Sequence, residues 1–311
     1  MAEVAEATEA PAAGVVNEHH RYRPGEPLRR YVAWYTGYRQ RGVPPARHRG
    51  LPSPYLTLIF TLDEPLRIEA HPDPGQPPGE FRALLGGLHS APALIRHDGA
   101  QSGVQLALRP PGVRALLGLP AGELADIDVP AEAVLGGVCA ELRDRVLSVT
   151  SWPRRFAIMD EILLRQLMAR DSPAVPAPEV LHAWRQLLRA GGAVRVGDLA
   201  AATGWSSRHL TSRFRAEIGL TPKAAARVIR FDRAKQTLIR HLSTGASPAG
   251  SPAGSVATGG YQLADLAADT GYFDQAHLAR EFRALAGVPP SQWLAEEFRN
   301  VQAGTWLADG G

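Results

Sequence analysis

The sequence predicts an α+β protein with a β-rich N-terminal domain that also contains helices and an all-α C-terminal domain. Three observations predict this fold class. A block that begins at Leu199 is repeated from Leu266, and both copies have the spacing of two short helices joined by a turn. Basic residues are concentrated in the same region. Between residues 55 and 108, short apolar runs are separated by Pro, Gly and Asp, as β-strands are.

Length and composition limit the class of protein. A chain of 311 residues is long enough for about two domains. Met1–Gly14 is acidic and Ala-rich, so it lacks the basic and apolar regions of a secretory signal, and no run of about twenty apolar residues occurs. We therefore expect a soluble, cytoplasmic protein with no membrane partner. Cys139 is the only cysteine, and we expect it to be a buried, apolar side chain.

The repeat has the pattern of two helix-turn-helix units. Its two copies are Leu199–Trp205 followed by Leu210 and Phe214, and Leu266–Tyr272 followed by Leu278 and Phe282, with one extra residue in the second turn. A Leu and a Phe four residues apart lie on one face of a helix, which we expect to be buried. The second helix of such a unit enters the major groove of DNA. We place the two units at about residues 194–222 and 261–290.

Charge is unevenly distributed in a way that fits DNA binding. The chain has a net charge of +3, and residues 194–300 alone carry thirteen Lys and Arg against nine Asp and Glu. Most of this excess lies between Arg208 and Arg240, as expected of a surface that binds phosphates. The second unit has only three Arg against six acids from residue 261 to 300. We expect it to hold DNA less firmly than the first unit, or to lie partly against another protein.

The helical faces opposite the buried stripe give candidate DNA contacts. Arg and Gln have the reach and the hydrogen-bonding groups to read guanine and adenine, and Ala can contact a thymine methyl group. Ser206 and Asp274 suit N-caps of the two recognition helices. The candidate base-reading residues are Arg208, Thr211, Ser212, Gln275, Ala279 and Arg280. The candidate backbone contacts are Ser206, Arg215, Lys223, Arg227 and Arg283.

The C-terminal region resembles the DNA-binding domain of AraC/XylS bacterial transcription regulators. The residues that carry this resemblance are Ser206–Arg215, Pro222 with Arg230–Ala234, and Gly271–Arg283 with Gly287 and Pro290. The resemblance implies two helix-turn-helix units joined by a long helix, double-stranded promoter or operator DNA and RNA polymerase as partners, and a role as activator or repressor.

Two departures from that family pattern are visible. Where the family often has Tyr-Arg, this chain has Trp293-Leu294, so a basic contact at position 294 is not expected. A Ser-, Pro-, Ala- and Gly-rich insertion occupies residues 243–260, where members of the family usually have only a few residues. We expect a flexible loop, which is either a tolerated surface insertion or a device that lets the units bridge differently spaced half-sites.

The N-terminal part resembles the cupin-like sensor domains of the same family, in particular one poorly characterised subgroup. The expected strands are 55–62, 66–70, 81–88, 93–96 and 104–108, and the expected helices are 132–146 and 153–168. We divide the chain into a disordered tail (1–20), a ligand-sensing and dimerisation domain (21–172) and the DNA-binding domain (173–300). A small-molecule effector and a homodimer follow from the resemblance, but it names no effector.

Two other classes of function stay open. A protein partner could regulate the DNA-binding module by contacting the acidic second unit or the apolar stripe at 156–167. An enzyme or a metal-binding cupin would need a catalytic or ligand pattern. His48, His71, His89 and His97 lack metal-ligand spacing, and we expect solvated loop histidines. We therefore expect no catalytic residues, no metal and no cofactor.

Overall fold

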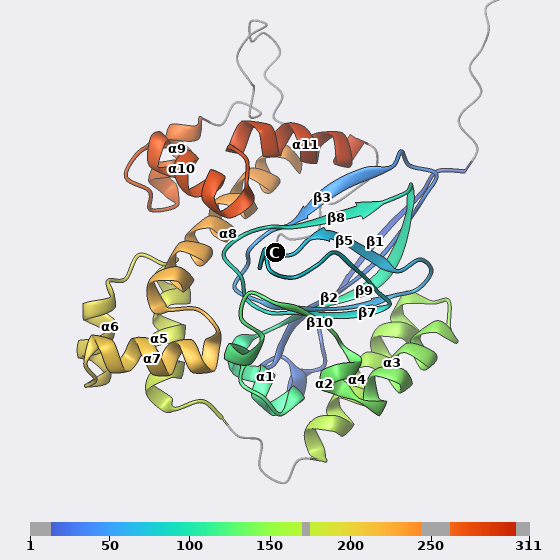
Figure 1. Cartoon of the computed structure of the whole chain (residues 1–311), viewed down its shortest axis with the longest axis horizontal. Helices are drawn as coiled ribbons and strands as arrows, with labels where there is room; N and C mark the ends of the chain where they lie inside the picture. Colours follow the sequence, from blue (N-terminus) through green and yellow to red (C-terminus); the bar gives the residue numbers. More distant parts are fainter. Residues whose placement is uncertain (1–13, 170–174, 244–261, 303–311) are drawn as a thin grey trace, which may run out of the picture.

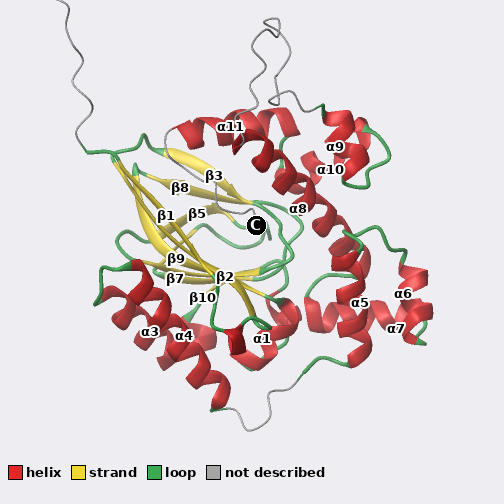
Figure 2. Cartoon of the chain, turned by 180° about the vertical axis from the view of Figure 1, so that it is seen from behind, coloured by secondary structure: helices red, strands yellow, loops and turns green. Residues whose placement is uncertain are grey.

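The structure, a computed structural model, describes residues 14–169, 175–243 and 262–302. In these residues an N-terminal β-rich domain is followed by a helical region, and the two lie side by side in Figures 1 and 2. The expected α+β class is confirmed. The insertion at 243–260, apart from Ser243 at its edge, lies outside the described residues. None of the helices that the structure describes is long and apolar enough to cross a lipid bilayer.

Two antiparallel sheets form the N-terminal domain. The larger has the strand order β1-β2-β9-β4-β7-β10, with bounds Val16–Tyr22, Val32–Arg41, Ala100–Leu108, Leu56–Thr61, Ala83–Gly86 and Asp128–Pro130. The smaller has the order β3-β8-β5-β6, with bounds Ala46–Gly50, Ala93–His97, Leu66–Ala70 and Gly79–Phe81. Between the sheets lies a small apolar cluster of Ile59, Leu66, Ile68, Leu84 and Ile95.

Helices cover the outer face of the larger sheet (Figure 1). They are α1 (Pro110–Leu117), α2 (Glu132–Leu135), α3 (Gly137–Leu147) and α4 (Trp152–Met168), with short 3-10 turns η1 (Glu26–Leu28) and η2 (Ala121–Leu124). Phe156 of α4 stacks on Tyr22 at 5.1 Å between ring centroids. Met159, Ile162 and Leu163 are also buried. The stripe at 156–167 is therefore mainly packed inside the domain, which disfavours the alternative in which a protein partner contacts it.

Seven helices follow within the described part of the C-terminal region. They are α5 (Pro178–Arg189), α6 (Val196–Thr203), α7 (Ser207–Ile218), α8 (Pro222–Ser243), α9 (Leu263–Asp269), α10 (Gln275–Ala286) and α11 (Pro290–Gln302). Helix α6 with α7, and α9 with α10, are the two expected helix-turn-helix units. The long helix α8 connects them, as the family resemblance implies. The buried residues of both regions form one continuous core cluster, from Leu28 to Leu294.

The expected strands and helices are found with shifted boundaries. The run at 81–88 is divided between β6 and β7, and the helix expected at 132–146 is interrupted at Gly136, which has φ +54°. Left-handed backbone of this kind ends a helix and suits glycine. Strands β1, β2, β3 and β10 were not expected, because their sequences mix charged residues with apolar ones and show no regular alternation.

Candidate DNA-binding surface and ligand cavities

The first recognition helix, α7, begins as its sequence requires. The Ser206 side chain accepts a hydrogen bond from the backbone N–H of His209 at 3.2 Å, which satisfies one of the free amides at the helix start. The turn before it contains Gly204 at φ +71°. His209 packs edge-on against Trp205 at 4.5 Å. The N-cap expected at Ser206 is confirmed.

The second recognition helix, α10, repeats this arrangement. Asp274 accepts a hydrogen bond from the N–H of His277 at 2.6 Å, so the expected N-cap is confirmed here too. Gly271 in the turn has φ +78°, close to that of Gly204. His277 packs edge-on against Tyr272 at 5.3 Å. The two units are thus alike in turn, cap and ring contact, as well as in sequence.

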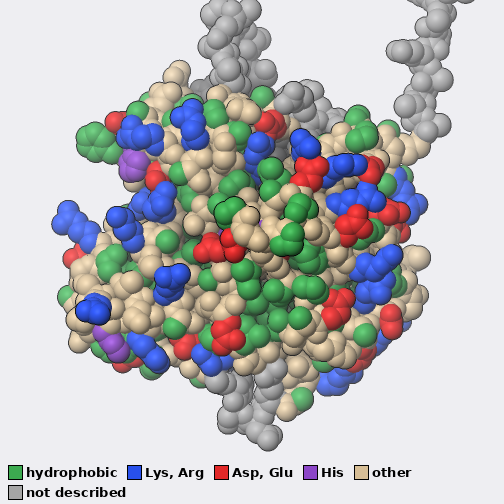
Figure 3. All heavy atoms as spheres, in the orientation of Figure 1, with side chains coloured by type: hydrophobic (Ala, Val, Ile, Leu, Met, Phe, Trp, Pro, Cys, Tyr) green, Lys and Arg blue, Asp and Glu red, His purple; other side chains and the backbone are tan. Residues whose placement is uncertain are grey.

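Both helices bury the expected stripe and expose the opposite face. The side chains of Leu210, Phe214, Leu278 and Phe282 are fully buried. Of the candidate base-reading residues, Arg208, Ser212, Gln275 and Arg280 are exposed, and Thr211 and Ala279 are partly exposed. In Figure 3, Lys and Arg side chains line the left edge of the molecule, where Figure 1 places α6, α7, α9 and α10.

The candidate backbone contacts fall into two groups. Ser206, Arg215, Lys223 and Arg283 are exposed. Arg227 of α8 is only partly exposed and donates from Nε to both carboxylate oxygens of Glu281 on α10, at 2.8 and 3.1 Å. This hydrogen bonding raises the pKa of Arg227. Arg227 therefore joins the connecting helix to the second recognition helix, a contact that its sequence position did not indicate.

Acidic residues of the second unit have structural partners. Asp274 caps α10, Glu281 binds Arg227, and Glu296 of α11 binds Arg49 of β3. Pro92, which precedes β8, lies against Gly287 at the end of α10. Three of the six acids of this unit thus make contacts within the chain. The surface that the unit lies against belongs to the N-terminal domain.

The N-terminal domain also contacts the first recognition helix. Arg114 of α1 donates to both carboxylate oxygens of Glu217, near the end of α7, at 3.0 to 3.2 Å. Glu217 is buried. Beside this pair η2 packs on α7, where a Cβ atom on Gly122 would lie 2.2 Å from the carbonyl oxygen of Ala216. Only a residue without a side chain permits this approach. Neither contact was foreseen, because the partners lie about a hundred residues apart.

A cavity of about 170 Å³ lies between the N-terminal domain and helix α8. From the strands and their loops it receives aromatic and amide side chains, among them Trp34, Tyr55 and Gln105. From α8 it receives Asp232, Lys235 and Ile239, and from α11 Trp293. Lys235 is buried and lies 3.0 Å from the Asp232 carboxylate. The cavity is thus walled by the domain that the sequence assigns to sensing and by the helix that connects the two DNA-binding units.

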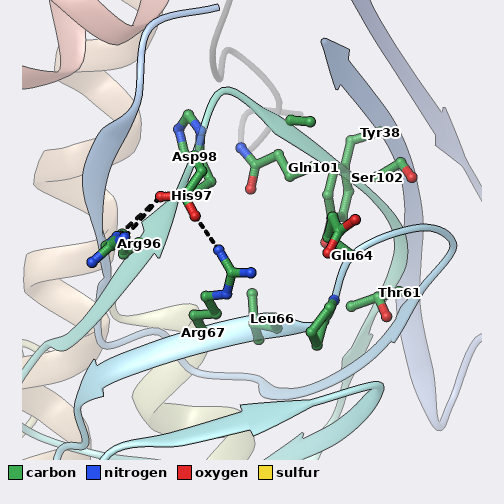
Figure 4. Close-up of a pocket in the computed structure, with 12 residues that line it drawn as sticks. Tyr38, Thr61, Glu64, Leu66, Arg67, Arg96, His97, Asp98, Gln101 and Ser102 are labelled. Carbon is green, nitrogen blue, oxygen red and sulfur yellow. Dashed lines mark hydrogen bonds and ion pairs between the residues drawn. The ribbon is translucent and has the colours of Figure 1, made fainter.

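A second cavity, of about 310 Å³, opens among the loops of the N-terminal domain (Figure 4). Its lining includes Arg67 and Arg96, both ion-paired with Asp98. Tyr38, Leu66 and Gln101 line this cavity as well as the first one. The two cavities are therefore neighbours that share these three side chains.

The four histidines differ from the expectation of solvated loop residues. His48 lies on β3 and His97 on β8, with ring centroids 6.1 Å apart. Burial, together with the smaller effect of the nearby His97, lowers the pKa of His48 to about 3. His71 is buried against Asp128 at 2.7 Å, and His89 is partly buried against the Ala91 carbonyl. In the described residues no three His, Cys, Asp or Glu side chains are grouped as a metal site.

Two smaller expectations agree with the structure. Cys139 is buried, and burial raises the pKa of its thiol to about 11, which leaves the protonated, unreactive form at neutral pH. Trp293 and Leu294 are buried in the core, so position 294 offers no contact to DNA.

Comparisons with known proteins cover both halves of the chain. Residues 20–130 match the family described as a domain of unknown function, DUF6597. No curated protein sequence matches the chain. The structure of ToxT from Vibrio cholerae O395 is 11% identical, with 84% of this chain and 96% of that chain covered and a TM-score of 0.47.

Two further solved structures are similar at comparable identity. Wild-type ToxT from Vibrio cholerae strain SCE256, bound to an unsaturated fatty acid, is 10% identical, with 92% of this chain and 97% of that chain covered and a TM-score of 0.45. The AraC-like transcriptional activator CuxR is 14% identical over 66% of this chain and 76% of that chain, with a TM-score of 0.27. Structural neighbours of this chain thus include ToxT and the AraC-like activator CuxR, and its β-rich N-terminal region matches the DUF6597 family.

Proposed function

We propose that this protein is a sequence-specific, DNA-binding transcription regulator of the AraC type. The observation that carries the proposal is the presence of two helix-turn-helix units with matching N-cap hydrogen bonds, turn glycines and buried stripes, each with an exposed face that includes polar and basic residues. Duplicated units of this kind suit two adjacent segments of major groove. The 22 residues of α8 span about 33 Å, which is close to the ~34 Å of one turn of duplex DNA.

Each recognition helix has a distinct set of proposed contacts. Arg280 suits a guanine and Gln275 an adenine, and Ala279 suits the methyl group of a thymine. On α7, Arg208, Thr211 and Ser212 are the proposed base contacts. Exposed Arg215, Lys223 and Arg283, with the helix start at Ser206, suit phosphates. Arg227 remains a proposed phosphate contact, although its guanidinium already binds Glu281.

The cavity beside α8 suits a small-molecule effector. Aromatic side chains such as Trp34 and Tyr55 favour an apolar body, and Gln105 and Lys235 offer hydrogen bonds. A molecule held there contacts the sensor domain and the helix that connects the DNA-binding units, so its binding would change how those units are held. In this role the protein acts in the cytoplasm with promoter DNA and RNA polymerase, and a second copy of the chain is a further proposed partner.

Selection from random duplex DNA tests the proposal. The purified full chain is mixed with the pool, bound duplexes are recovered and sequenced, and affinity is followed against salt. Enrichment of a two-part motif with half-sites about one turn apart, together with a steep loss of affinity with salt, is the expected result. Binding to all duplexes alike, over the whole salt range, would contradict sequence-specific recognition.

A metabolite panel tests the effector. A ligand that binds only the folded chain raises its melting temperature. In this screen, Trp34→Ala serves as the cavity variant, and the exposed Met168→Ala on α4 is its matched control. A ligand that binds in the cavity raises the melting temperature of wild type and of the control equally. It raises that of the cavity variant less.

A further inference from the structure

The second helix-turn-helix unit has one residue more than the first, and the structure assigns that residue. Trp205 and Tyr272 make the same edge contact with a histidine, and Ser206 and Asp274 make the same N-cap. In the first unit the ring residue and the cap are adjacent in sequence. In the second unit Phe273 stands between them. Phe273 is therefore the extra residue of the turn.

Phe273 points into solvent because its neighbours are fixed. Tyr272 on one side is buried, and Asp274 on the other caps α10. The backbone N–H of Phe273 also donates to Nδ1 of His277 at 3.3 Å. The Phe273 side chain is 93% exposed, more than any other exposed large hydrophobic side chain in the described ranges. Single exposed apolar side chains are common on protein surfaces, so the position of Phe273 within the unit decides what it can meet.

The place of Phe273 indicates which partner it meets. It directly precedes the N-cap of α10, and the N-terminal residues of a recognition helix are those that contact base edges. The first unit starts with the neutral Ser206, which tolerates a phosphate, whereas the carboxylate of Asp274 disfavours one. An aromatic ring beside that carboxylate is therefore better suited to an apolar group on a base than to the backbone.

We propose that Phe273 contacts the 5-methyl group of a thymine in the half-site bound by α10, and so contributes to sequence specificity. The methyl group of thymine is the apolar feature of the major groove, and phenylalanine is one of the side chains that recognise it. The inference rests on the proposed function, because it needs a DNA site. It adds a base contact that lies outside the recognition helix itself.

Replacement of thymine by uracil tests the contact, since uracil lacks only the methyl group. Each thymine of the half-site selected by the wild-type chain is replaced in turn, and binding is measured for wild type, Phe273→Ser and Phe273→Leu. Whereas a thymine contacted by Ala279 responds alike in all three proteins, we expect the replacement at the thymine that Phe273 contacts to weaken wild-type binding by about four-fold, the effect of one buried methyl group. The same replacement leaves Phe273→Ser binding unchanged, because that variant has already lost the contact. Phe273→Leu retains part of the sensitivity.

Controls separate this contact from other causes. Met168→Ser removes another exposed apolar side chain, far along the chain on α4, and keeps the wild-type sensitivity to uracil. An unchanged melting temperature for Phe273→Ser shows that the fold is intact. If no thymine matters, or if wild type and Phe273→Ser respond alike at every thymine of the half-site, the contact is overturned while selection of a site still supports the proposed function.

Two further outcomes are decisive. If the wild-type chain selects no site at all, the proposed function fails and the thymine contact fails with it. If Phe273→Ser binds every duplex as wild type does but activates transcription less in a purified system, Phe273 meets a protein and the DNA contact is overturned.

Discussion

Arg114 on α1 and Glu217 on α7 form a two-oxygen ion pair that joins the N-terminal domain to the first recognition helix. At the other side of the molecule, Arg49 on β3 binds Glu296 on α11. The N-terminal domain thus contacts both DNA-binding units. In the proposed function, these contacts are the route by which a molecule in the cavity would affect both units.

Replacement of Arg114 should destabilise the folded chain. Arg114→Ala leaves the carboxylate of Glu217 buried without its partner, and we expect the free energy of unfolding to fall by about 2 kcal/mol. Urea denaturation measures this loss. The matched control is Arg145→Ala, which breaks the exposed pair with Glu161 and should leave stability unchanged. Equal effects of the two substitutions would contradict a structural role for the Arg114 pair.

Base contacts and phosphate contacts should respond differently to mutation. We expect Arg280→Ala to relax base preference at one half-site, with a loss of about 1 to 3 kcal/mol on the preferred sequence only. Lys223→Ala should weaken binding to all sequences and reduce the slope of log affinity against log salt by about 1. Competition binding of the two variants over a range of salt concentrations distinguishes a base contact from a phosphate contact. A uniform loss for Arg280→Ala would remove it from the base-reading set.

Arg227→Ala should act through protein structure as well as through phosphate. Because its guanidinium binds Glu281, we expect the substitution to lower the free energy of unfolding by about 1 kcal/mol. The double variant Arg227→Ala with Glu281→Ala should regain part of this stability, since no carboxylate is then left alone. Lys223→Ala is the matched control and should not affect stability. Additive losses in the double variant would argue against the pair.

Stability should fall as the solution becomes acidic. The pKa of His48 in the folded chain, about 3, is below its ordinary value of 6.5, so the unfolded chain binds the proton first. The contribution of His48 is complete above pH 6.5 and is lost as pH falls towards 3. Between pH 7 and pH 5, the loss of this contribution lowers the free energy of unfolding by about 2 kcal/mol. The charged groups that share its cavity are Arg49, Asp232 and Lys235, with His89 beside them.

His48→Gln isolates this dependence. Glutamine does not titrate, so we expect the variant to lose less stability than wild type between pH 7 and pH 5. Urea denaturation at both values measures the difference. Parallel loss in the two proteins would show that other groups cause the acid sensitivity.

The features that were predicted from sequence are those fixed by neighbouring residues. Ser206 and Asp274 lie three residues before the amides that they cap, and Leu210 and Phe214 lie one helical turn apart. Local periodicity therefore suffices to find them. Strands such as β5, at Leu66–Ala70, are likewise set by a short apolar run between turns.

Contacts between distant parts of the chain were not predicted. Arg114 and Glu217 are 103 residues apart, and no local pattern relates them. The burial of His48 depends on β3, a strand of mainly charged and polar sequence that forms because it pairs with β8. The exposure of Phe273 follows from which ring occupies the core. The repeat aligns Tyr272 with Trp205, but that alignment does not show whether Tyr272 or Phe273 is buried. In each case tertiary packing decides the outcome.

The main core cluster, which runs from Leu28 to Leu294 and includes side chains of both regions, has a consequence for how the chain melts. Two domains with separate cores can unfold in two steps, but side chains of one shared core lose their neighbours together. Heating should therefore give one cooperative transition, seen at the same temperature by probes in either half. A molecule bound among the strands then protects the DNA-binding helices from unfolding without touching them, and removal of the strands exposes apolar surface that leads to aggregation.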